Sequence, residues 1–158
     1  MEKKDLLKDV IKHIDIKSYN STELVDAMRN MSFTSRDTAR AADILMMMCK
    51  EKECTNILTL AGSTSAAGCM QVYVDMVRNK MIDVVVATGA SIIDMDLFEA
   101  LGFKHYIGEK ENVIPYTTLR DLYIDRIYDT YIDEEELQAC DHTTFEIANM
   151  TPTPTTCW

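Results

Sequence analysis

Two apolar stretches, each followed by a loop of small residues and then a helix, constrain the fold of this chain most strongly. The first stretch is Asn56–Leu60 with the loop Ala61–Gly68, and the second is Ile82–Ala87 with the loop Thr88–Ser91. Strands that are apolar nearly throughout and joined by a helix are typical of parallel strands buried on both faces. The pattern therefore predicts an α/β fold with a right-handed crossover between the two strands.

Residues 1–50 carry helical rather than strand periodicity. The apolar side chains of residues 2–14 fall on one stripe, which predicts an amphipathic helix. Two further helices are predicted after it, the second ending near Lys50, and we expect its methionines Met46–Met48 to fill the core. The expected organisation is a helical segment over residues 1–50, an α/β portion over residues 51–149 and an irregular Thr/Pro tail over residues 150–158.

The carboxyl-terminal third of the sequence has mixed patterns. Phe103–Ile107 predicts a short strand, and residues 119–131, rich in Tyr and Ile, predict a helix or an irregular segment. Asp133 can cap a last helix from Glu134 to about Ala148. The first turn of that helix is acidic, as the helix dipole prefers.

Charge and hydropathy limit the classes of partner. The chain has 16 Lys and Arg against 26 Asp and Glu, a formal net charge of -10, which disfavours binding to nucleic acid phosphates. The negative charge favours the approach of a cationic small molecule or a basic protein. A net charge of this size is also explained by solubility alone. No apolar run approaches the roughly 20 residues of a membrane helix. Met1–Asp5 lacks the apolar stretch of a signal peptide, so we expect a cytoplasmic protein.

The two small-residue loops are the candidate ligand site. In a parallel α/β sheet, ligands bind outside the carboxyl ends of the strands. Small residues let a ligand approach the backbone, and the following helix offers N–H groups to an anion, so the loops could hold the two phosphates of a dinucleotide. The same composition suits tight turns and close helix packing, and neither G-x-G-x-x-G nor G-x-x-x-x-G-K-[ST] is present. The residues alone leave both interpretations open.

Few other residues suggest chemistry. Asp94 and Asp96 can accept from a ribose hydroxyl or an amine, but Asp is also favoured at a helix N-cap. The cluster Cys140–His142 does not predict a metal site, because adjacent residues on a helix point apart. His105 has no acidic or Cys neighbour in the sequence, which favours a structural role, and no catalytic triad can be assembled from local spacing.

Four stretches of the sequence resemble the deoxyhypusine synthase family, in particular its bacterial and archaeal deoxyhypusine synthase-like branch. They are Asn30–Asp37, Leu58–Val77, Val86–Tyr106 and Tyr123–Asn149. The resemblance implies a Rossmann-like α/β domain in a homotetramer, with NAD at a dimer interface. It also implies oxidation of spermidine by NAD and transfer of its aminobutyl group. The acceptor would be a lysine of a hypusine-bearing translation factor or, as in homospermidine synthase-like relatives, a free polyamine.

The resemblance further implies which residues hold the cofactor. The first NAD loop falls on Gly62, Ser63, Ala66 and Ala67, the second on Thr88, Gly89 and Ala90, and the acidic cofactor residue on Asp94. Gly62 and Ala66 carry no hydroxyl, so their contacts would come from the backbone. The eukaryotic pattern has two adjacent Glu where this chain has Ile93 and Asp94.

The length of the chain is the main departure from the family. Family members are much longer, and their catalytic lysine lies in the carboxyl half with most of the spermidine contacts. The resemblance therefore implies a truncated fold with no catalytic residue of its own, inactive in isolation. The alternative is a non-catalytic regulatory or assembly subunit of a full-length paralogue. In either case, an uncovered strand edge favours association into an oligomer.

Overall fold

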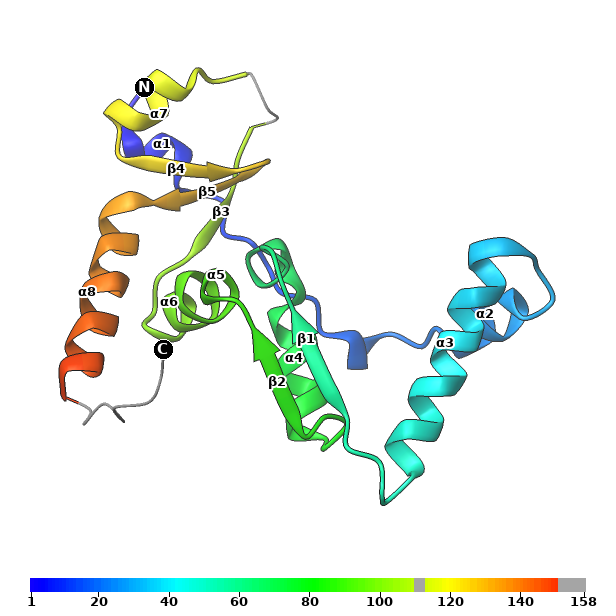
Figure 1. Cartoon of the computed structure of the whole chain (residues 1–158). Helices are drawn as coiled ribbons and strands as arrows, with labels where there is room; N and C mark the ends of the chain where they lie inside the picture. The colour runs from blue at the N-terminus through cyan, green and yellow to red at the C-terminus, as the bar shows by residue number, and fades with distance from the viewer. Residues whose placement is uncertain (110–112, 151–158) are drawn as a thin grey trace. The chain divides into compact units, whose positions relative to one another are not determined.

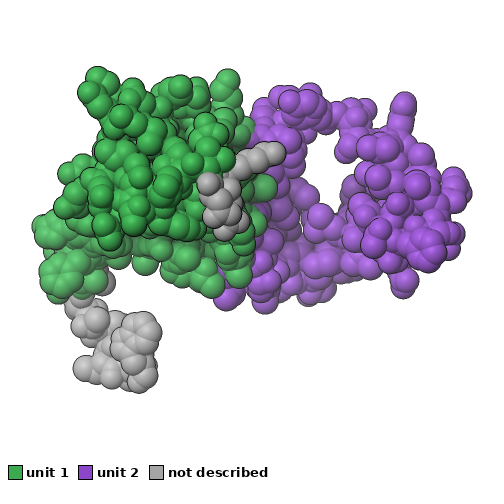
Figure 2. Space-filling view, turned by 90° about the horizontal axis from the view of Figure 1, so that it is seen from above, with its two compact units in different colours: residues 1–13, 61–70, 87–158 green, residues 14–60, 71–86 purple. Residues whose placement is uncertain are grey.

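The computed structural model describes residues 1–109 and 113–150. The chain forms two compact units, coloured separately in Figure 2. The first unit comprises Met1–His13, Ala61–Met70 and the described residues from Ala87 onward, and the second comprises Ile14–Leu60 and Gln71–Val86. Apart from Met150, the tail predicted for residues 150–158 lies outside the described residues.

A two-stranded parallel sheet forms the strand part of the second unit (Figure 1). Its strands are β1 (Ile57–Leu60) and β2 (Val84–Ala87), and α4 (Met70–Arg78) lies between them in the chain. The predicted β-α-β order is thereby confirmed. Asn56, directly before β1, is hydrogen-bonded to the segment that leads into β2. Its side-chain amide donates to the carbonyl of Met81 across 3.0 Å.

The predicted burial of these strands on both faces is wrong. Val84, Val85 and Val86 are 42%, 42% and 55% exposed, and Ile57 of β1 is 57% exposed. A sheet of two strands has too few neighbours to cover both of its faces. The apolar character of β2 is therefore an uncovered surface in this chain rather than part of its core.

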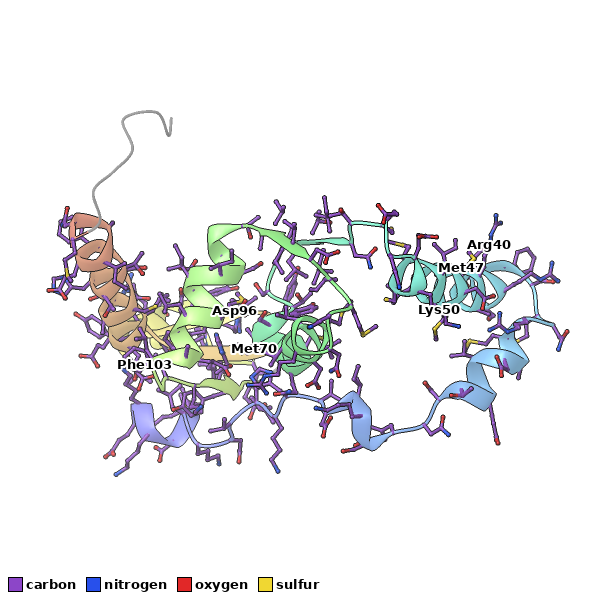
Figure 3. The ribbon with its side chains drawn as sticks, turned by 90° about the horizontal axis from the view of Figure 1, so that it is seen from below. Arg40, Met47, Lys50, Met70, Asp96 and Phe103 are labelled. Carbon is purple, nitrogen blue, oxygen red and sulfur yellow. The ribbon has the colours of Figure 1, made fainter. Side chains whose placement is uncertain are left out.

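The helical part of the second unit consists of η1 (Ile16–Ser18), α2 (Thr22–Met28) and α3 (Phe33–Lys50). The helix predicted to end near Lys50 is confirmed by α3. Figure 3 labels three of its side chains: Arg40, Met47 and Lys50. Met46 and Met47 are 55% and 62% exposed, so the prediction that these methionines fill the core is wrong.

An antiparallel sheet lies in the first unit, with strand order β3-β5-β4 (Figure 1). The strands are β3 (His105–Ile107), β4 (Ile124–Ile127) and β5 (Thr130–Asp133), and α7 (Tyr116–Asp121) precedes β4. The strand predicted at Phe103–Ile107 is confirmed. The helix or irregular segment predicted for residues 119–131 is wrong, because β4 and β5 form a hairpin there. Pairing of β5 with β3 supplies the long-range hydrogen bonds that stabilise this conformation.

The helix predicted for residues 2–14 is also wrong beyond its first turn. The helix α1 covers Lys3–Leu6, and Val10 then forms a β-bridge with Tyr106. The backbone N–H of Ile11 donates to the carbonyl of His105 across 2.9 Å, and that of Ile107 donates to Asp9 across 2.7 Å. The segment lies along β3 because these backbone groups find partners on that strand.

A long helical stretch and a final helix complete the first unit. The stretch is made of α5 (Gly89–Ser91), η3 (Ile92–Leu97) and α6 (Phe98–Ala100), and the final helix is α8 (Glu134–Met150). The last predicted helix is thus confirmed. Its cap is confirmed as well, because the Asp133 carboxylate accepts from the backbone N–H of Glu135 across 2.9 Å.

Two apolar clusters form the core of the first unit. Phe98, Ile132 and Cys140 are at most 2% exposed and join α6, β5 and α8. The other cluster gathers side chains from α7, β4 and β5 with the residue before α7: Ile114, Leu119, Ile124 and Tyr131. The hairpin and the helical stretch after β2 are therefore fixed by the same buried contacts.

Candidate functional site

The small-residue loops begin where β1 and β2 end, as predicted, but each is shorter than expected. The first passes into a helical turn, η2 (Ser65–Cys69), where the N–H of Ala67 donates to the carbonyl of Ser63 across 3.0 Å. After the second strand, Thr88 is followed at once by helix from Gly89. Both strand ends therefore lead almost directly into the start of a helix.

A hydrogen bond between the loops brings them together. The Oγ of Ser91 donates to the carbonyl oxygen of Gly62 across 2.9 Å, and it lies 3.2 Å from the Oγ1 of Thr88. Ser91 is 1% exposed, so water does not compete strongly for its hydroxyl. The structure thus places Gly62 and Thr88, one from each predicted loop, around a single buried side chain.

The glycines of the loops divide into two kinds. Gly62 has a φ of +78°, which favours glycine, and a Cβ added there would meet nothing within 4 Å. A Cβ at Gly89 would also stand in open space. Gly68, with a φ of +97°, is different, because a Cβ there would lie 3.1 Å from the carbonyl oxygen of Lys12. Gly68 therefore permits close packing, whereas Gly62 and Gly89 leave the backbone open to an approaching ligand.

A cavity of about 230 Å³ lies against the first loop. Its lining comes from that loop and from the β4–β5 hairpin: Ser63, Thr64, Ala66, Ala67, Ile127, Tyr128, Asp129 and Thr130. Within the loop, the Oγ of Ser65 is buried without a hydrogen-bond partner among the described residues. Three predicted cofactor residues, Ser63, Ala66 and Ala67, therefore share one cavity.

The predicted residues of the second loop and Asp94 do not line this cavity. Thr88, Gly89 and Ala90 are exposed. Asp94 is half-buried on η3, where burial, and then the negative charge of Asp141, raise the pKa of its carboxyl. Burial and the charges of Asp141 and Asp94 likewise raise the pKa of the Cys140 thiol. The Asp94 carboxylate is therefore within electrostatic reach of α8.

The sequence analysis did not predict the β4–β5 hairpin that forms one wall of this cavity. Ile127 pairs with Thr130, so Tyr128 and Asp129 form a two-residue turn, and Tyr128 has a φ of +54°. Two runs rich in Ile, Tyr and Thr separated by two residues are a hairpin signal. That spacing is present in the sequence, but the turn lacks the glycine or asparagine that usually marks it.

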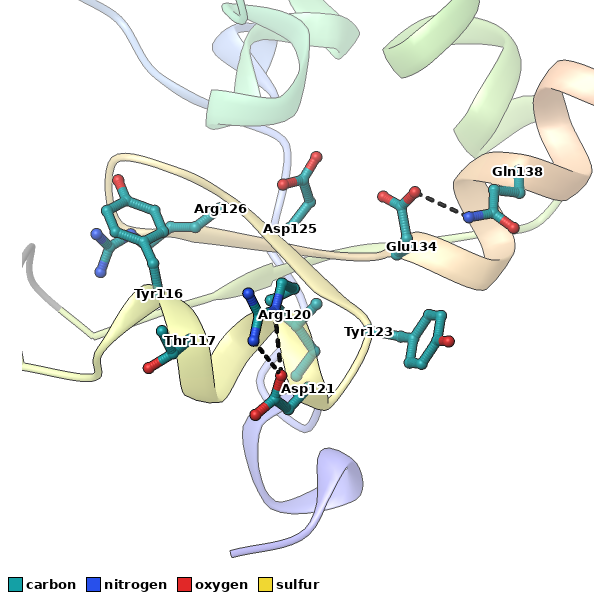
Figure 4. Close-up of a pocket in the computed structure, with 10 residues that line it drawn as sticks. Tyr116, Thr117, Arg120, Asp121, Tyr123, Asp125, Arg126, Glu134 and Gln138 are labelled. Atoms are coloured by element: carbon teal, nitrogen blue, oxygen red, sulfur yellow. Dashed lines mark hydrogen bonds and ion pairs between the residues drawn. The ribbon is translucent and has the colours of Figure 1, made fainter.

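A larger cavity of about 920 Å³ lies among α7, β4 and the start of α8 (Figure 4). Its lining includes none of the predicted cofactor residues. The Arg126 guanidinium carbon lies 4.2 Å from the centroid of the Tyr116 ring, and Arg120 Nη2 pairs with Asp121 across 2.9 Å. The lining carries both arginines and carboxylates, so its charge does not favour one class of ligand.

Two histidines flank a partly buried carboxylate in the first unit. Glu99 Oε1 lies 2.7 Å from His105 Nδ1, and Glu99 Oε2 lies 2.6 Å from His13 Nε2. Burial favours a raised Glu99 pKa, but the hydrogen bonds and charges of His105 and His13 outweigh it and lower that pKa. His105 therefore has an acidic partner that is not adjacent in the sequence, and this partner ties it to the N-terminal segment.

Within residues 1–109 and 113–150, no three His, Cys, Asp or Glu side chains gather as a metal-binding group. Cys140 is buried and its thiol donates to the carbonyl of Ile93 across 3.5 Å, while Asp141 and His142 are exposed. No helix in the same residues combines the length and apolar character needed to cross a bilayer.

Comparison with known proteins gives one consistent family. The family model described as deoxyhypusine synthase matches residues 23–157. The deoxyhypusine synthase-like protein of Caulobacter vibrioides is 64% identical over 148 residues, which covers 94% of this chain and 40% of that protein. The deoxyhypusine synthase-like protein of Coxiella burnetii is 58% identical over 147 residues, covering 93% and 41%. The probable deoxyhypusine synthase 2 of Methanosarcina acetivorans is 36% identical over 129 residues, covering 82% and 36%.

These matches agree with the resemblance carried by the loop and helix stretches. The chain spans about 40% of the length of the Caulobacter and Coxiella relatives. The family model covers both small-residue loops, the helical stretch after β2, and the hairpin. The chain therefore belongs to the deoxyhypusine synthase family.

Proposed function

We propose that this chain supplies the NAD-binding loops of a deoxyhypusine synthase-like aminobutyl transferase, built on a Rossmann-like sheet. The observation that carries the proposal is the hydrogen bond from Ser91 to the Gly62 carbonyl. It holds together two loops that follow neighbouring parallel strands. Such strand ends are where open α/β sheets bind nucleotides, so one dinucleotide can contact both loops.

The residues present fit a dinucleotide. Open space beside Gly62 and Gly89 admits phosphate oxygens close to the backbone. The hydroxyls of Ser63 and Thr88 can donate to the same oxygens, while Ala66, Ala67 and Ala90 leave room for them. Asp94 is proposed to accept a hydrogen bond from the cofactor. These residues bind and orient the cofactor, and NAD, when bound, would supply the oxidation of the amine substrate.

The proposed substrate is spermidine or a related polyamine. Its aminobutyl group would pass to a lysine of a translation factor or to a free polyamine. The net charge of -10 favours the approach of a cationic amine. In the family, the lysine that forms the imine intermediate is in the carboxyl half, so none of the residues in this chain is assigned that role.

A second candidate function is assembly with a full-length paralogue. The observation in its favour is the uncovered apolar surface of β2, where Val84, Val85 and Val86 are each more than 40% exposed. An exposed strand of this kind is a site for pairing with another chain. In this role the chain would stabilise a heteromer without binding substrate itself.

Calorimetric titration of NAD into the purified chain tests the first proposal, alone and in the presence of a full-length relative. Gly89→Val adds a side chain where the structure has open space, so the fold should tolerate it while the ligand is blocked. We expect a loss of at least about tenfold in NAD affinity, which equals about 1.4 kcal/mol. Ala100→Val, at the exposed end of α6, is the matched control and should bind like the parent. Absence of NAD binding under both conditions would overturn the proposal.

A further inference from the structure

The cavity beside the first loop has two chemically different walls. The loop wall offers backbone, methyl groups and the hydroxyls of Ser63 and Thr64, whereas the carboxylate among the lining residues is that of Asp129. A carboxylate repels a phosphate but accepts hydrogen bonds from hydroxyl groups. The cavity therefore suits a ligand that carries a phosphate on one side and hydroxyls on the other.

The wall that carries Asp129 is held in place by backbone hydrogen bonds. The carbonyl of Asp129 accepts from the N–H of Gly108 across 2.7 Å. The flanking residues, Ile127 and Thr130, are paired across the hairpin, and Thr130 is 7% exposed. The Asp129 side chain is exposed, but its attachment point is fixed on a short turn. The backbone that carries the Asp129 carboxylate is therefore held in place at the edge of the cavity.

The size of the cavity narrows the choice of ligand. Pockets for drug-sized ligands measure about 300–1,000 Å³, whereas this cavity measures about 230 Å³. It accommodates a ribose with its adjoining phosphate rather than an entire dinucleotide. Hydrogen bonding of ribose hydroxyls by an acidic residue is a recurring device in dinucleotide-binding folds.

We infer that Asp129, on the hairpin turn, binds the ribose hydroxyls of the dinucleotide and thereby selects NAD over NADP. The inference rests on the proposed function, since it concerns the same cofactor. Asp94 is the acidic cofactor residue that the family resemblance implies, but it does not line this cavity. A 2′-phosphate on the ribose would meet the Asp129 carboxylate as a like charge, so the wall disfavours the phosphorylated cofactor.

The test compares NAD and NADP titrations of the parent chain with Asp129→Ala and Asp129→Asn. We expect Asp129→Ala to weaken NAD binding about tenfold, as expected for loss of a hydrogen bond to a charged group. Asp129→Asn should raise NADP affinity relative to NAD by about tenfold, because the like charge is removed. A purely structural role would lower both affinities together and leave that ratio unchanged.

Asp125→Asn is the matched control, because Asp125 is an exposed carboxylate on the same hairpin that does not line this cavity. It should bind NAD and NADP like the parent, and thermal melts should show all variants folded. Parental NAD affinity and an unchanged NAD-to-NADP ratio in both Asp129 variants would overturn the inference. If Gly89→Val lost NAD binding in the same series, the proposed function would stand and this inference alone would fail. If the parent bound no NAD, both would fail.

Discussion

The Ser91 hydroxyl donates to the Gly62 carbonyl across 2.9 Å, and this contact joins two loops whose residues are 29 positions apart in the sequence. Ser91 is buried at the start of the helical stretch that follows β2, and Gly62 begins the loop that follows β1. Gly62 belongs to the first of the two proposed cofactor loops, and Ser91 follows directly after the second. Their contact fixes the distance between the two loops that are proposed to bind NAD.

Ser91→Ala should lower both stability and NAD affinity. Loss of this hydrogen bond should cost about 0.5–1.5 kcal/mol of unfolding free energy, and the loops should hold the cofactor less well. Denaturant unfolding and NAD calorimetry measure the two effects. Thr143→Ala removes a hydroxyl that donates within α8, to the carbonyl of Ala139 across 2.9 Å, and it should leave NAD affinity unchanged. Equal NAD affinity in both variants would contradict the role given to Ser91.

Asp94→Asn should stabilise the fold near neutral pH while weakening NAD binding. Burial and Asp141 raise the pKa of this carboxyl, so the folded state binds the proton more tightly than the unfolded state does. Stability from this group is therefore lost as the pH rises from the ordinary Asp pKa through the raised one. Because Asn carries no charge, the variant does not lose this stability as the pH rises. Thermal melts from pH 4 to 8 and NAD titration provide the measurements, and Asp96→Asn should affect NAD less. A larger NAD effect at Asp96 would contradict the assignment.

Glu99→Gln should destabilise the first unit by about 1.5–3 kcal/mol, the range for hydrogen bonds to a charged group. The two histidines lower the Glu99 pKa although burial opposes them. The stabilisation of the folded state by Glu99 is therefore complete above the ordinary Glu pKa. It is lost as the pH falls through the lowered pKa of the folded state. Urea unfolding at several pH values checks this. Glu146→Gln is the control, because Glu146 contacts His142 on the exposed face of α8 and should cost little. Equal effects of the two variants on the free energy of unfolding would contradict the stabilising role given to Glu99.

The chain should associate with itself or with a longer relative at micromolar concentration. Covering the valines of β2 buries apolar area at about 25 cal/mol per Å². Light scattering should report the association, and Val85→Lys should weaken it because Val85 is 42% exposed on β2. Leu24→Lys places the same charge on α2, where the side chain is 61% exposed, and should leave association unchanged. A stable monomer that binds no apolar dye would contradict this prediction.

The 158-residue chain by itself should not transfer an aminobutyl group from spermidine. Imine catalysis needs a lysine amine at the substrate, and the family resemblance assigns that lysine to a region outside this sequence. Turnover of radiolabelled spermidine with NAD provides the measurement, with a full-length relative as the positive control. Turnover by this chain at the rate of the relative would contradict the prediction.

Local sequence patterns were sufficient for several elements. The apolar runs at β1 and β2 and the helical periodicity of α3 and α8 predict those elements within a few residues. Capping by Asp133 was also predictable, because a carboxylate at an N-cap accepts from N–H groups only two or three residues away. In each case the interactions that stabilise the element are close in the sequence, so its own residues contain the information.

The candidate site was only partly predictable. The small-residue loop after the first strand is a local signal, and the family resemblance implies Ser63, Ala66 and Ala67 as cofactor residues within it. The opposite wall at Tyr128 and Asp129 could not be predicted, since its position depends on pairing between the hairpin and a strand distant in the sequence. The same reason explains the extended segment at Val10, whose helical periodicity yields to backbone hydrogen bonds with β3.

The sequence alone therefore determined the order β1, α4, β2, the helices α3 and α8, and the family to which the chain is similar. The tertiary structure decided which side chains share a cavity, because Ser63 and Asp129 are brought together only by strand pairing and helix packing. It also decided which apolar residues are buried. Phe98 is fully buried between α8 and the sheet, whereas Val86, equally apolar by pattern, is 55% exposed because β2 has too few neighbours to cover it.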